Sequence, residues 1–481
     1  MGKVPYAIPY KEEPLVSFEY GTDVSLGQAM FGHAQLDDER RTARLVATFD
    51  ALCRHPGGTL PDKLSAPAEL KAFYRLCACA SVTHVALIAA ARSYTLARLA
   101  AHPGPVLLLH DATELDYSTL STLSEQLGQI GKGTHRGYIC HNVLAVDAQT
   151  GEVLGLVDQI LHCRDEVPDD ETLTELRERE TRESLLWLKG TQHLPSDPRL
   201  VDIADQGAST FEFLEHQTKS GRRFVIRNGK VRKAYAGHEA TGPKHYLQDY
   251  VESLPELGCF TMDVQPQKGR QARTDAQFTL RGGAILLLPP HAKHGHHGRE
   301  PLPLYVVHVA EVDPPRGEHP ITWMLITNEP IHSCADAWRV VSWYERRWII
   351  EEYHKALKTG CRIEDLQFTY VQRLQPAIAL LSAVALTLLT MRDASRRPDA
   401  HTRLATTLVA REYVEVLSSW RHGKLRCDLT IHEFFFALAR LGGHQNRKHD
   451  HRPGWLVLWR GWTKLQCMLD GYLAAKRKKC G

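Results

Sequence analysis

The sequence lacks the features that define several common protein classes. Its eleven cysteines include no CxxC pair, so neither a zinc motif nor a disulfide framework is indicated. The N-terminal residues form no apolar segment of the kind that a signal peptide needs. No internal repeat is present. The absence of these features predicts a cytoplasmic protein with reduced thiols.

A strong net charge is also missing, and long apolar runs are rare. Lys and Arg number 59 against 56 Asp and Glu, which gives a formal net charge of +3 and by itself indicates no nucleic-acid partner. The one long uncharged stretch, from Leu374 to Met391, contains Pro376 and stands alone. We expect a buried core helix there and no membrane partner.

The pattern of apolar residues divides the 481-residue chain into segments of different type. Residues 26–100 show helical spacing, for example at Leu45, Phe49 and Leu52, and Pro56-Gly57-Gly58 interrupts them. From Pro105 the period changes to that of strands. The sequence therefore predicts a small N-terminal helical domain followed by a domain of another class.

Short apolar runs that alternate with helical segments predict an α/β core. Two of these runs are strands that end in a carboxylate, at Asp111 and at Asp205. Residues 138–148 and 152–161 read as a β-hairpin, and 223–227 as a further strand.

The strand-helix alternation stops over residues 230–320, which read as a β-rich insertion. After a strand at 321–326, a long helix is expected from near Ser333 to about Thr359, with Gly360 as its stop. The remaining residues are mostly helical in pattern.

That long helix carries a distinctive face. An α-helix turns about 100° per residue, so Glu351 and four residues around it fall within an arc of roughly 80°. These four neighbours are Tyr344, Arg347, Lys355 and Lys358. An ordinary solvated face with intrahelical ion pairs would look similar. Two further carboxylates at strand ends, where open α/β sheets build their sites, favour a functional interpretation.

Three converging carboxylates repel one another unless a cation lies among them. Mg²⁺ prefers oxygen ligands, and two such ions about 4 Å apart assist in-line displacement at phosphorus. We therefore expect Asp111, Asp205 and Glu351 to bind two Mg²⁺ per active site, with Mn²⁺ as a substitute. The chemistry predicts an enzyme that cuts or joins phosphodiester bonds. The nearby acidic residues Glu114, Asp116 and Asp202 are interpreted as local structural groups.

These residues resemble a known family. The segment 344–360 matches the Tyr-x2-Arg-x3-Glu-x6-Lys signature of the transposases of insertion-sequence family four, of the transposon-five type. His110-Asp111-Ala-Thr resembles that family's first catalytic Asp motif, and Ala204-Asp205 its second. The similarity extends over most of the chain. One departure is Asp205-Gln206-Gly207, where the family often has Asp-Arg-Glu.

The resemblance implies a ribonuclease-H-like catalytic core with a β-rich insertion, flanked by N-terminal and C-terminal helical domains. The expected domains are 1–100 for DNA-end binding, 101–372 for catalysis and 373–481 for dimerisation. The implied partners are double-stranded DNA (transposon ends and target) and a second subunit in a synaptic homodimer, and the protein would be nucleoid-associated. The implied reaction is nicking by water, hairpin formation, hairpin resolution and strand transfer.

The resemblance also implies DNA-contacting residues. Trp323 would occupy the space around a flipped base, Arg227 would line the site, and the basic and phenolic residues of the Glu351 helix would hold phosphates. The expected DNA-binding set is Arg40, Arg41, Arg44, Arg75, Arg227, Trp323, Tyr344, Arg347, Lys355 and Lys358.

Several of these features have ordinary structural interpretations. Trp323 fits a strand pattern and could be core, and the arginines at 40–44 could be a charged helix face. The histidines at 291–297 suggest metal spacing but fit a solvent-exposed turn better. Trp455, Trp459 and Trp462 fit core or dimer contacts. The alternative functions are a metal-dependent nuclease without strand transfer and a catalytically inactive DNA-binding inhibitor.

Overall fold

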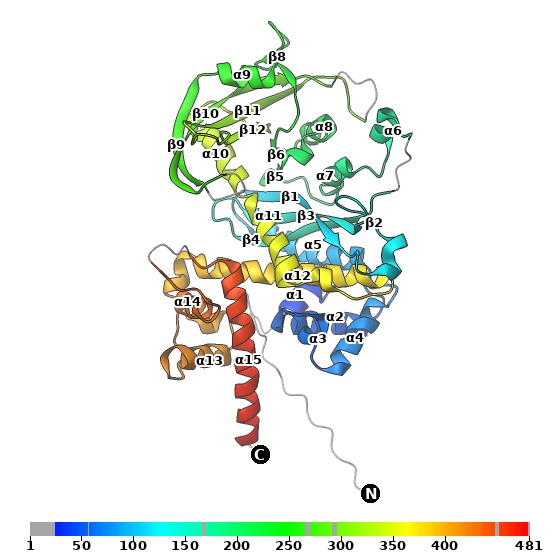
Figure 1. Cartoon of the computed structure of the whole chain (residues 1–481), viewed down its shortest axis with the longest axis vertical. Coiled ribbons are helices and arrows are strands. Elements are labelled where there is room, and N and C mark those ends of the chain that lie inside the picture. The colour runs from blue at the N-terminus through cyan, green and yellow to red at the C-terminus, as the bar shows by residue number, and fades with distance from the viewer. Residues whose placement is uncertain are drawn as a thin grey trace. The chain divides into compact units, whose positions relative to one another are not determined.

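The computed structural model describes residues 25–55, 57–165, 170–264, 270–290, 296–447 and 452–479. The chain divides into two compact units. One contains Thr95–His354, and the other combines Met1–Tyr94 with Lys355–Gly481. The N-terminal and C-terminal helices thus share one unit (Figure 1), and the three-domain division expected from the sequence remains a prediction.

The Thr95–His354 unit is built on one mixed sheet, so the expectation of an α/β class is confirmed. Among the described residues the sheet has twelve strands in the order β2-β3-β1-β5-β6-β12-β11-β10-β7-β8, with β4 on β3 and β9 on β10. The strands are β1 (Val106–Asp116), β2 (Gly128–Gln129), β3 (Arg136–Asp147), β4 (Val153–His162), β5 (Leu200–Ala204), β6 (Arg223–Arg227), β7 (Lys233–Ala236), β8 (His245–Tyr246), β9 (Glu256–Val264), β10 (Arg273–Leu287), β11 (Leu302–Glu311) and β12 (Thr322–Thr327).

The helices of this unit are α6 (Leu173–Glu178), α7 (Leu186–Lys189), α8 (Phe211–Lys219), α9 (Leu247–Ser253), α10 (Cys334–Glu345) and α11 (Trp348–Lys355). The expected hairpin is confirmed, because β3 and β4 pair antiparallel. Its turn contains Gly151 at φ 76°, and Asp147 caps the turn by accepting from the Gln149 N–H at 2.9 Å.

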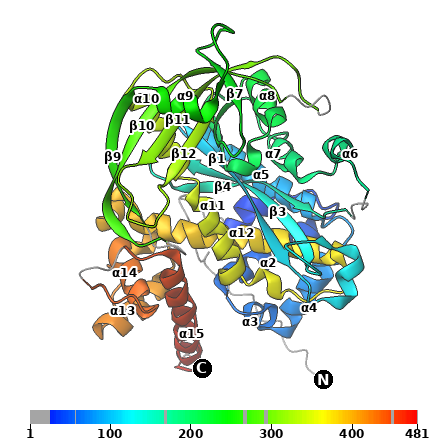
Figure 2. The same cartoon turned by 45° about the horizontal axis from the view of Figure 1, so that its top comes forward.

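The segment predicted as a β-rich insertion extends the same sheet instead of interrupting it. It lies between β6 and β12, which pair antiparallel with each other. Its long strands β9 and β10 are paired and visibly curved in Figure 2. A right-handed twist and the register shifts between these two strands account for such curvature.

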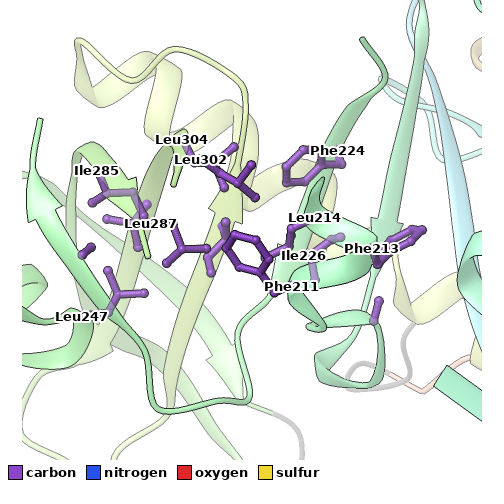
Figure 3. Close-up of a cluster of buried hydrophobic side chains, with 14 of the residues drawn as sticks. Phe211, Phe213, Leu214, Phe224, Ile226, Leu247, Ile285, Leu287, Leu302 and Leu304 are labelled. Carbon is purple, nitrogen blue, oxygen red and sulfur yellow. The ribbon is translucent and has the colours of Figure 1, made fainter. Parts of the chain in front are cut away.

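A hydrophobic cluster fixes α8 and α9 on this sheet. Phe211 and Leu214 of α8 pack with Ile226 and Leu287 of the sheet, and Leu247 of α9 joins them (Figure 3). All five are at most 3% exposed. Since apolar burial stabilises by about 25 cal/mol per Å², this cluster fixes the loops that leave the ends of β5 and β6.

The predicted single helix from Ser333 to Thr359 is wrong in its continuity. Ser333 does cap its start, but α10 ends at Glu345 and α11 begins at Trp348. Between them successive N–H groups bond to the third residue back, as in Arg347 N to Tyr344 O at 3.0 Å. This tighter 3₁₀ spacing rotates one half of the helix relative to the other. A π-helical turn at Ala356–Gly360 follows.

The other unit is helical. Its helices are α1 (Leu26–Phe31), α2 (Glu39–Arg54), α3 (Leu60–Lys63), α4 (Pro67–Cys77), α12 (Val371–Arg396), α13 (Arg411–His422), α14 (Ile431–Leu441) and α15 (Trp455–Lys479), and α5 (His84–Ala101) crosses the division. Helix α12 is the one described helix long and apolar enough to span a membrane, and 89% of its apolar window is buried. The prediction of a buried core helix is confirmed.

The C-terminal aromatic residues are also buried within the chain. Trp462 is 1% exposed and stacks on Tyr413 at a ring distance of 4.9 Å. Trp455 and Trp459 are 7% and 6% exposed, and Phe434 is fully buried. These side chains are core, which leaves little of their surface for a second subunit.

Candidate active site

Asp111 on β1 and Asp205, directly after β5, lie at the same level of the sheet. β1 and β5 are parallel, and their register ends at His110↔Ala204, so the next residue of each chain segment is one of these aspartates. Adjacent strands lie about 4.8 Å apart. The register therefore brings the two carboxylates together, as the sequence predicted.

One detail of that prediction is wrong, because Asp111 does not end its strand. β1 continues to Asp116, since β3 pairs with it from Asp111↔Asn142 to Asp116↔Gly137. Asp205 does follow the end of β5, and it accepts a hydrogen bond from the Gly207 N–H at 2.9 Å.

Arg347 joins the third carboxylate to the first. Its Nη1 donates to Asp111 Oδ2 at 3.0 Å and its Nη2 donates to Glu351 Oε1 at 2.5 Å. The Arg347 and Asp111 side chains are 16% and 17% exposed, and that of Glu351 is 30% exposed. The break between α10 and α11 places Arg347 next to the sheet, where one guanidinium bridges two acidic residues.

The pKa of Asp111 reflects its burial and the charged groups around it. Burial raises the pKa of Asp111 from 3.8 to about 6; Arg347 lowers this pKa, whereas the charges of Asp205 and Glu351 raise it. The carboxyl group is thus held in an environment that disfavours its charged form. Strongly shifted pKa values of this kind cluster at functional sites.

This shift predicts that Asp111 destabilises the free protein at neutral pH. The folded-state pKa lies above the unfolded value, so the folded state binds the proton more tightly and stability falls as pH rises from about 4 through 6. Asp111→Asn should therefore raise the stability by about 2–3 kcal/mol at pH 8. Thermal unfolding midpoints in EDTA would measure this. The gain should shrink as pH falls toward 4, and a loss of stability at pH 8 would contradict the proposed origin of the shift.

The donor set fits a divalent metal in chemistry, because Mg²⁺ is held by carboxylate oxygens. The arrangement differs from a preformed metal site: among the residues that the structure describes, no three His, Cys, Asp or Glu side chains are close enough to coordinate one ion. The guanidinium of Arg347 lies between Asp111 and Glu351 and supplies the compensating charge. A cation bound by Asp111 and Glu351 would take over the charge compensation that Arg347 provides in this structure.

An aromatic pair lines the other side of Arg347. The rings of Trp323 and Tyr344 meet edge-to-face at 5.5 Å, and the Arg347 guanidinium lies 6.0 Å from the Tyr344 ring centroid. Burial raises the pKa of Tyr344, whereas Arg347 and Arg227 lower it. Trp323 is only half-buried. The expected site residues Arg227, Trp323, Tyr344 and Arg347 are therefore neighbours.

The sequence did not reveal what holds α11 against the sheet. Buried Asn142 of β3 contacts His354 of α11, with 3.1 Å between Nδ2 and Nε2, and Gln159 of β4 donates to Asn142 Oδ1 at 2.8 Å. His354 follows Glu351 by one helical turn on the same helix. The only sequence signal was an Asn in an otherwise apolar strand pattern.

Asp202, interpreted as structural, lies in a buried ion-pair network behind the site. It accepts from Arg222 Nε at 2.9 Å and from Gln217 Nε2 at 2.7 Å, and its Oδ1 lies 2.8 Å from His110 Nε2. Although burial opposes it, hydrogen bonding from His110 and the charge of Arg222 lower the pKa of Asp202 to about 2. The network anchors β1 and β5 next to Asp111 and Asp205.

The structure explains why Gly207 stands where the resembled family often has Glu. A Cβ on Gly207 would lie 2.6 Å from the ring of Trp187, so no side chain fits there without rearrangement. The Glu that the family often carries at this position is therefore excluded by Trp187.

The other expected DNA-binding residues lie in the helical unit. Arg44 on α2 and Arg75 on α4 are exposed, and the Arg40 side chain is 92% exposed. Arg41 instead donates to Leu36 O and to Ser81 Oγ within the protein.

Two further expectations concern lysines and histidines. Lys355 belongs to the helical unit, as does Lys358, whose Nζ lies 3.1 Å from Glu364 Oε1. Of the histidine-rich stretch, His291 and His294 lie outside the described residues. His297 packs its ring against Phe211 at 5.4 Å.

Carboxylates converging from neighbouring strands and a following helix define a class of polynucleotidyl-transfer enzymes. Comparison with protein families agrees with this class. The family described as "Transposase DDE domain" matches residues 102–388, and the one described as "Transposase DNA-binding" matches residues 26–82. The first match covers more than half of the chain, so the protein belongs to the DDE transposase family and carries a transposase DNA-binding domain.

Proposed function

We propose that the protein is a cut-and-paste transposase of insertion-sequence family four, of the transposon-five type. It binds the terminal inverted repeats of its element, excises the element by hydrolysis and hairpin formation, and joins the 3′-OH ends to target DNA. The observation that carries this proposal is the bridge from Asp111 through Arg347 to Glu351, with Asp205 on the adjacent strand.

The proposed metal ligands are Asp111, Asp205 and Glu351, with two Mg²⁺ per site and Mn²⁺ as a substitute. When bound, the ions would assist attack by water or 3′-OH and stabilise the leaving oxygen. Arg347 and Tyr344 would then orient the phosphate, because a guanidinium released from two carboxylates can donate to phosphate oxygens in the same forked geometry. Lys355 and Lys358 would hold the flanking backbone.

The sheet order supports a ribonuclease-H-like core. β4, β3 and β1 form an antiparallel meander, and β5 and β6 continue the sheet parallel to β1. We propose that residues 1–100 bind the DNA ends through Arg40, Arg44 and Arg75, and that residues 373–481 form the synaptic homodimer. The free surface of α15 is a better candidate for this interface than its buried tryptophans.

Trp323 is proposed to stabilise a base that is flipped out during hairpin formation. It is half-buried against Tyr344, and a contact of an aromatic ring with an extruded base offsets part of the few kcal/mol that extrusion costs. Trp323→Ala should therefore slow hairpin formation about 10-fold more than first-strand nicking. Quenched reactions on end-labelled DNA separate the two steps. Trp323→Phe should retain most of the activity, whereas equal loss of both steps would indicate a core role.

The function as a whole is tested with a linear DNA that carries the terminal repeats flanking the gene. Wild-type protein in Mg²⁺ should release the element with hairpin ends and join it to a supercoiled target. Cutting without joining would identify a nuclease, and binding without cutting would identify an inhibitor.

A further inference from the structure

A basic groove of about 1450 Å³ opens in the Thr95–His354 unit, beyond the ends of β5 and β6. Of the described residues, eight cationic and three acidic side chains line it, an excess of five positive charges. The cationic residues are Arg164, Arg179, Arg182, Lys230, Arg232, Lys233, Lys244 and Arg299. A groove with this charge attracts polyanions.

The two walls of the groove differ in how their charge is compensated. On the wall near α6, each arginine has a carboxylate partner. These ion pairs are Arg164–Glu183, Arg179–Glu171 and Arg182–Glu212. On the wall formed by the β6–β7 turn, Lys230, Arg232 and Lys233 have no carboxylate partner within the described part of the chain. Lys244 and Arg299 also have no carboxylate partner among the described residues, so the uncompensated positive charge of the groove lies on these five side chains.

Arg232 is the strongest element of that wall because it is buried. Only 8% of it is exposed, and its hydrogen bonds go to neutral acceptors. Nε donates to Asn228 Oδ1 at 3.0 Å, and Nη2 donates to Ser209 O at 2.6 Å and to Ser209 Oγ at 3.2 Å. Burial lowers the pKa of Arg232 to about 10, and no acidic group contributes to raising it. A buried cation without a counter-charge is costly unless an anion binds beside it.

The N-terminal end of α8 adds further positive charge to the groove next to Arg232. Ser209, Thr210 and Phe211 line the groove, and Thr210 caps the helix through the Phe213 N–H at 3.2 Å. The N-terminal end of a helix carries partial positive charge and N–H groups without partners inside the helix. Phe211 anchors this end in the hydrophobic cluster (Figure 3), so the helix terminus and Arg232 are held in a fixed arrangement.

Exposed side chains along the groove favour a nucleic acid over a small anion. Tyr246 is 49% exposed, with Lys233 Nζ 4.8 Å from its ring centroid, and Val231 is 89% exposed. Grooves that bind a DNA strand combine cations for the backbone with aromatic faces for the bases. A free phosphate ion would not contact an exposed aromatic ring or an exposed aliphatic side chain.

We propose that Arg232 and the N-terminus of α8 bind a backbone phosphate of a DNA strand that runs along this groove. The inference rests on the proposed function and extends it. Ser209, which Arg232 contacts, lies four residues after Asp205, and Asn228 directly follows Arg227, so Arg232 binds the loop that carries Asp205. Arg232 is thereby a positioning residue that ties the Asp205 loop to the β6–β7 turn.

The test compares Arg232→Gln with Lys219→Gln, which removes a cation from the exposed end of the same helix α8. Binding of a fluorescein-labelled 20-nucleotide single strand and of its duplex is measured by anisotropy in EDTA, where no cleavage step is needed. Arg232→Gln should weaken binding by about 10-fold or more at low salt and reduce the salt dependence by about one phosphate contact. Lys219→Gln should bind like wild type. Equal affinity of Arg232→Gln and wild type would overturn the proposal.

Inorganic phosphate distinguishes the two possible sources of the anion. If DNA is the ligand, phosphate should compete with the oligonucleotide only at high concentration, and should raise the thermal midpoint of wild type but not of Arg232→Gln. Tight phosphate binding combined with oligonucleotide affinity that Arg232→Gln leaves unchanged would identify a free-anion site instead. Lys230→Gln, which alters an exposed side chain, provides a folded variant if Arg232→Gln unfolds, and should also weaken DNA binding. Because these measurements need no catalysis, failed cleavage would count against the transposase proposal without touching this one.

Discussion

Replacing Asp111, Asp205 or Glu351 by alanine is expected to slow first-strand nicking by a factor on the order of 10³ or more. Each removes one of three carboxylates, which lie within β1, directly after β5 and in the first turn of α11. Loss of a catalytic ligand raises the barrier by several kcal/mol, and each 1.36 kcal/mol is tenfold in rate. Binding of the DNA ends should remain, because the proposed DNA contacts are made by basic and aromatic side chains and not by these carboxylates. Nicking of end-labelled DNA and gel-shift affinity measure the two properties.

Glu114→Ala is the matched control for these variants. Glu114 is on the same strand as Asp111, is half-exposed and accepts from the Gly131 N–H at 2.7 Å. It should cut at the wild-type rate. Near-wild-type nicking by any of the three catalytic variants would remove that residue from the site.

The second large effect is expected at Arg347, which has two roles. In the free protein it compensates Asp111 and Glu351, so Arg347→Ala should lower the thermal midpoint in EDTA, and Mg²⁺ should restore it. In the reaction it would hold a phosphate, and removal of one such donor costs about 10²-fold in rate. Arg347→Lys should recover the stability better than the rate, because an ammonium cannot reproduce the forked geometry.

Arg346 provides the control for this prediction. It precedes Arg347, and its Nη2 donates to Gln149 O at 2.9 Å in the β3–β4 turn. Arg346→Ala should leave the nicking rate unchanged. If Arg347→Ala cut as fast as Arg346→Ala, the bridge between the two carboxylates would have no catalytic role.

The corresponding positions of Asp111 and Asp205 on the sheet could be predicted from the sequence, because the local apolar pattern determines the two strands. An apolar run that ends in Asp is readable for β5, and the parallel register with β1 then brings Asp111 beside Asp205. The full length of β1 could not be predicted from the sequence. The residues of β1 after Asp111 are strand because they pair with β3, which is a separate segment of the chain.

The helix that carries Glu351 could be predicted only in part from the sequence. Periodicity correctly grouped Tyr344, Arg347 and Glu351, and Ser333 was readable as a cap. The break between α10 and α11 was not, because the residues there have ordinary helical propensity and the interruption accompanies a contact from Arg347 to Asp111 on the sheet. The contact of His354 with Asn142 depends on tertiary packing in the same way.

The sequence also does not show which arginines near the site have a carboxylate partner. Arg182 and Arg232 are both arginines in polar segments. Arg182 has a carboxylate partner, whereas Arg232 is buried without one. Only the folded arrangement shows which of them is available to an external anion.

The central claim, that Asp111, Asp205 and Glu351 form the catalytic metal site, is tested most directly by Mn²⁺ binding. Mn²⁺ is titrated into protein bound to a duplex of its terminal repeat, and the free-ion EPR signal is recorded. The wild-type protein should take up about two Mn²⁺ per chain. The uptake should be lost when Asp111→Asn, Asp205→Asn and Glu351→Gln are combined. Equal uptake by the wild-type protein and this triple variant would contradict the central claim.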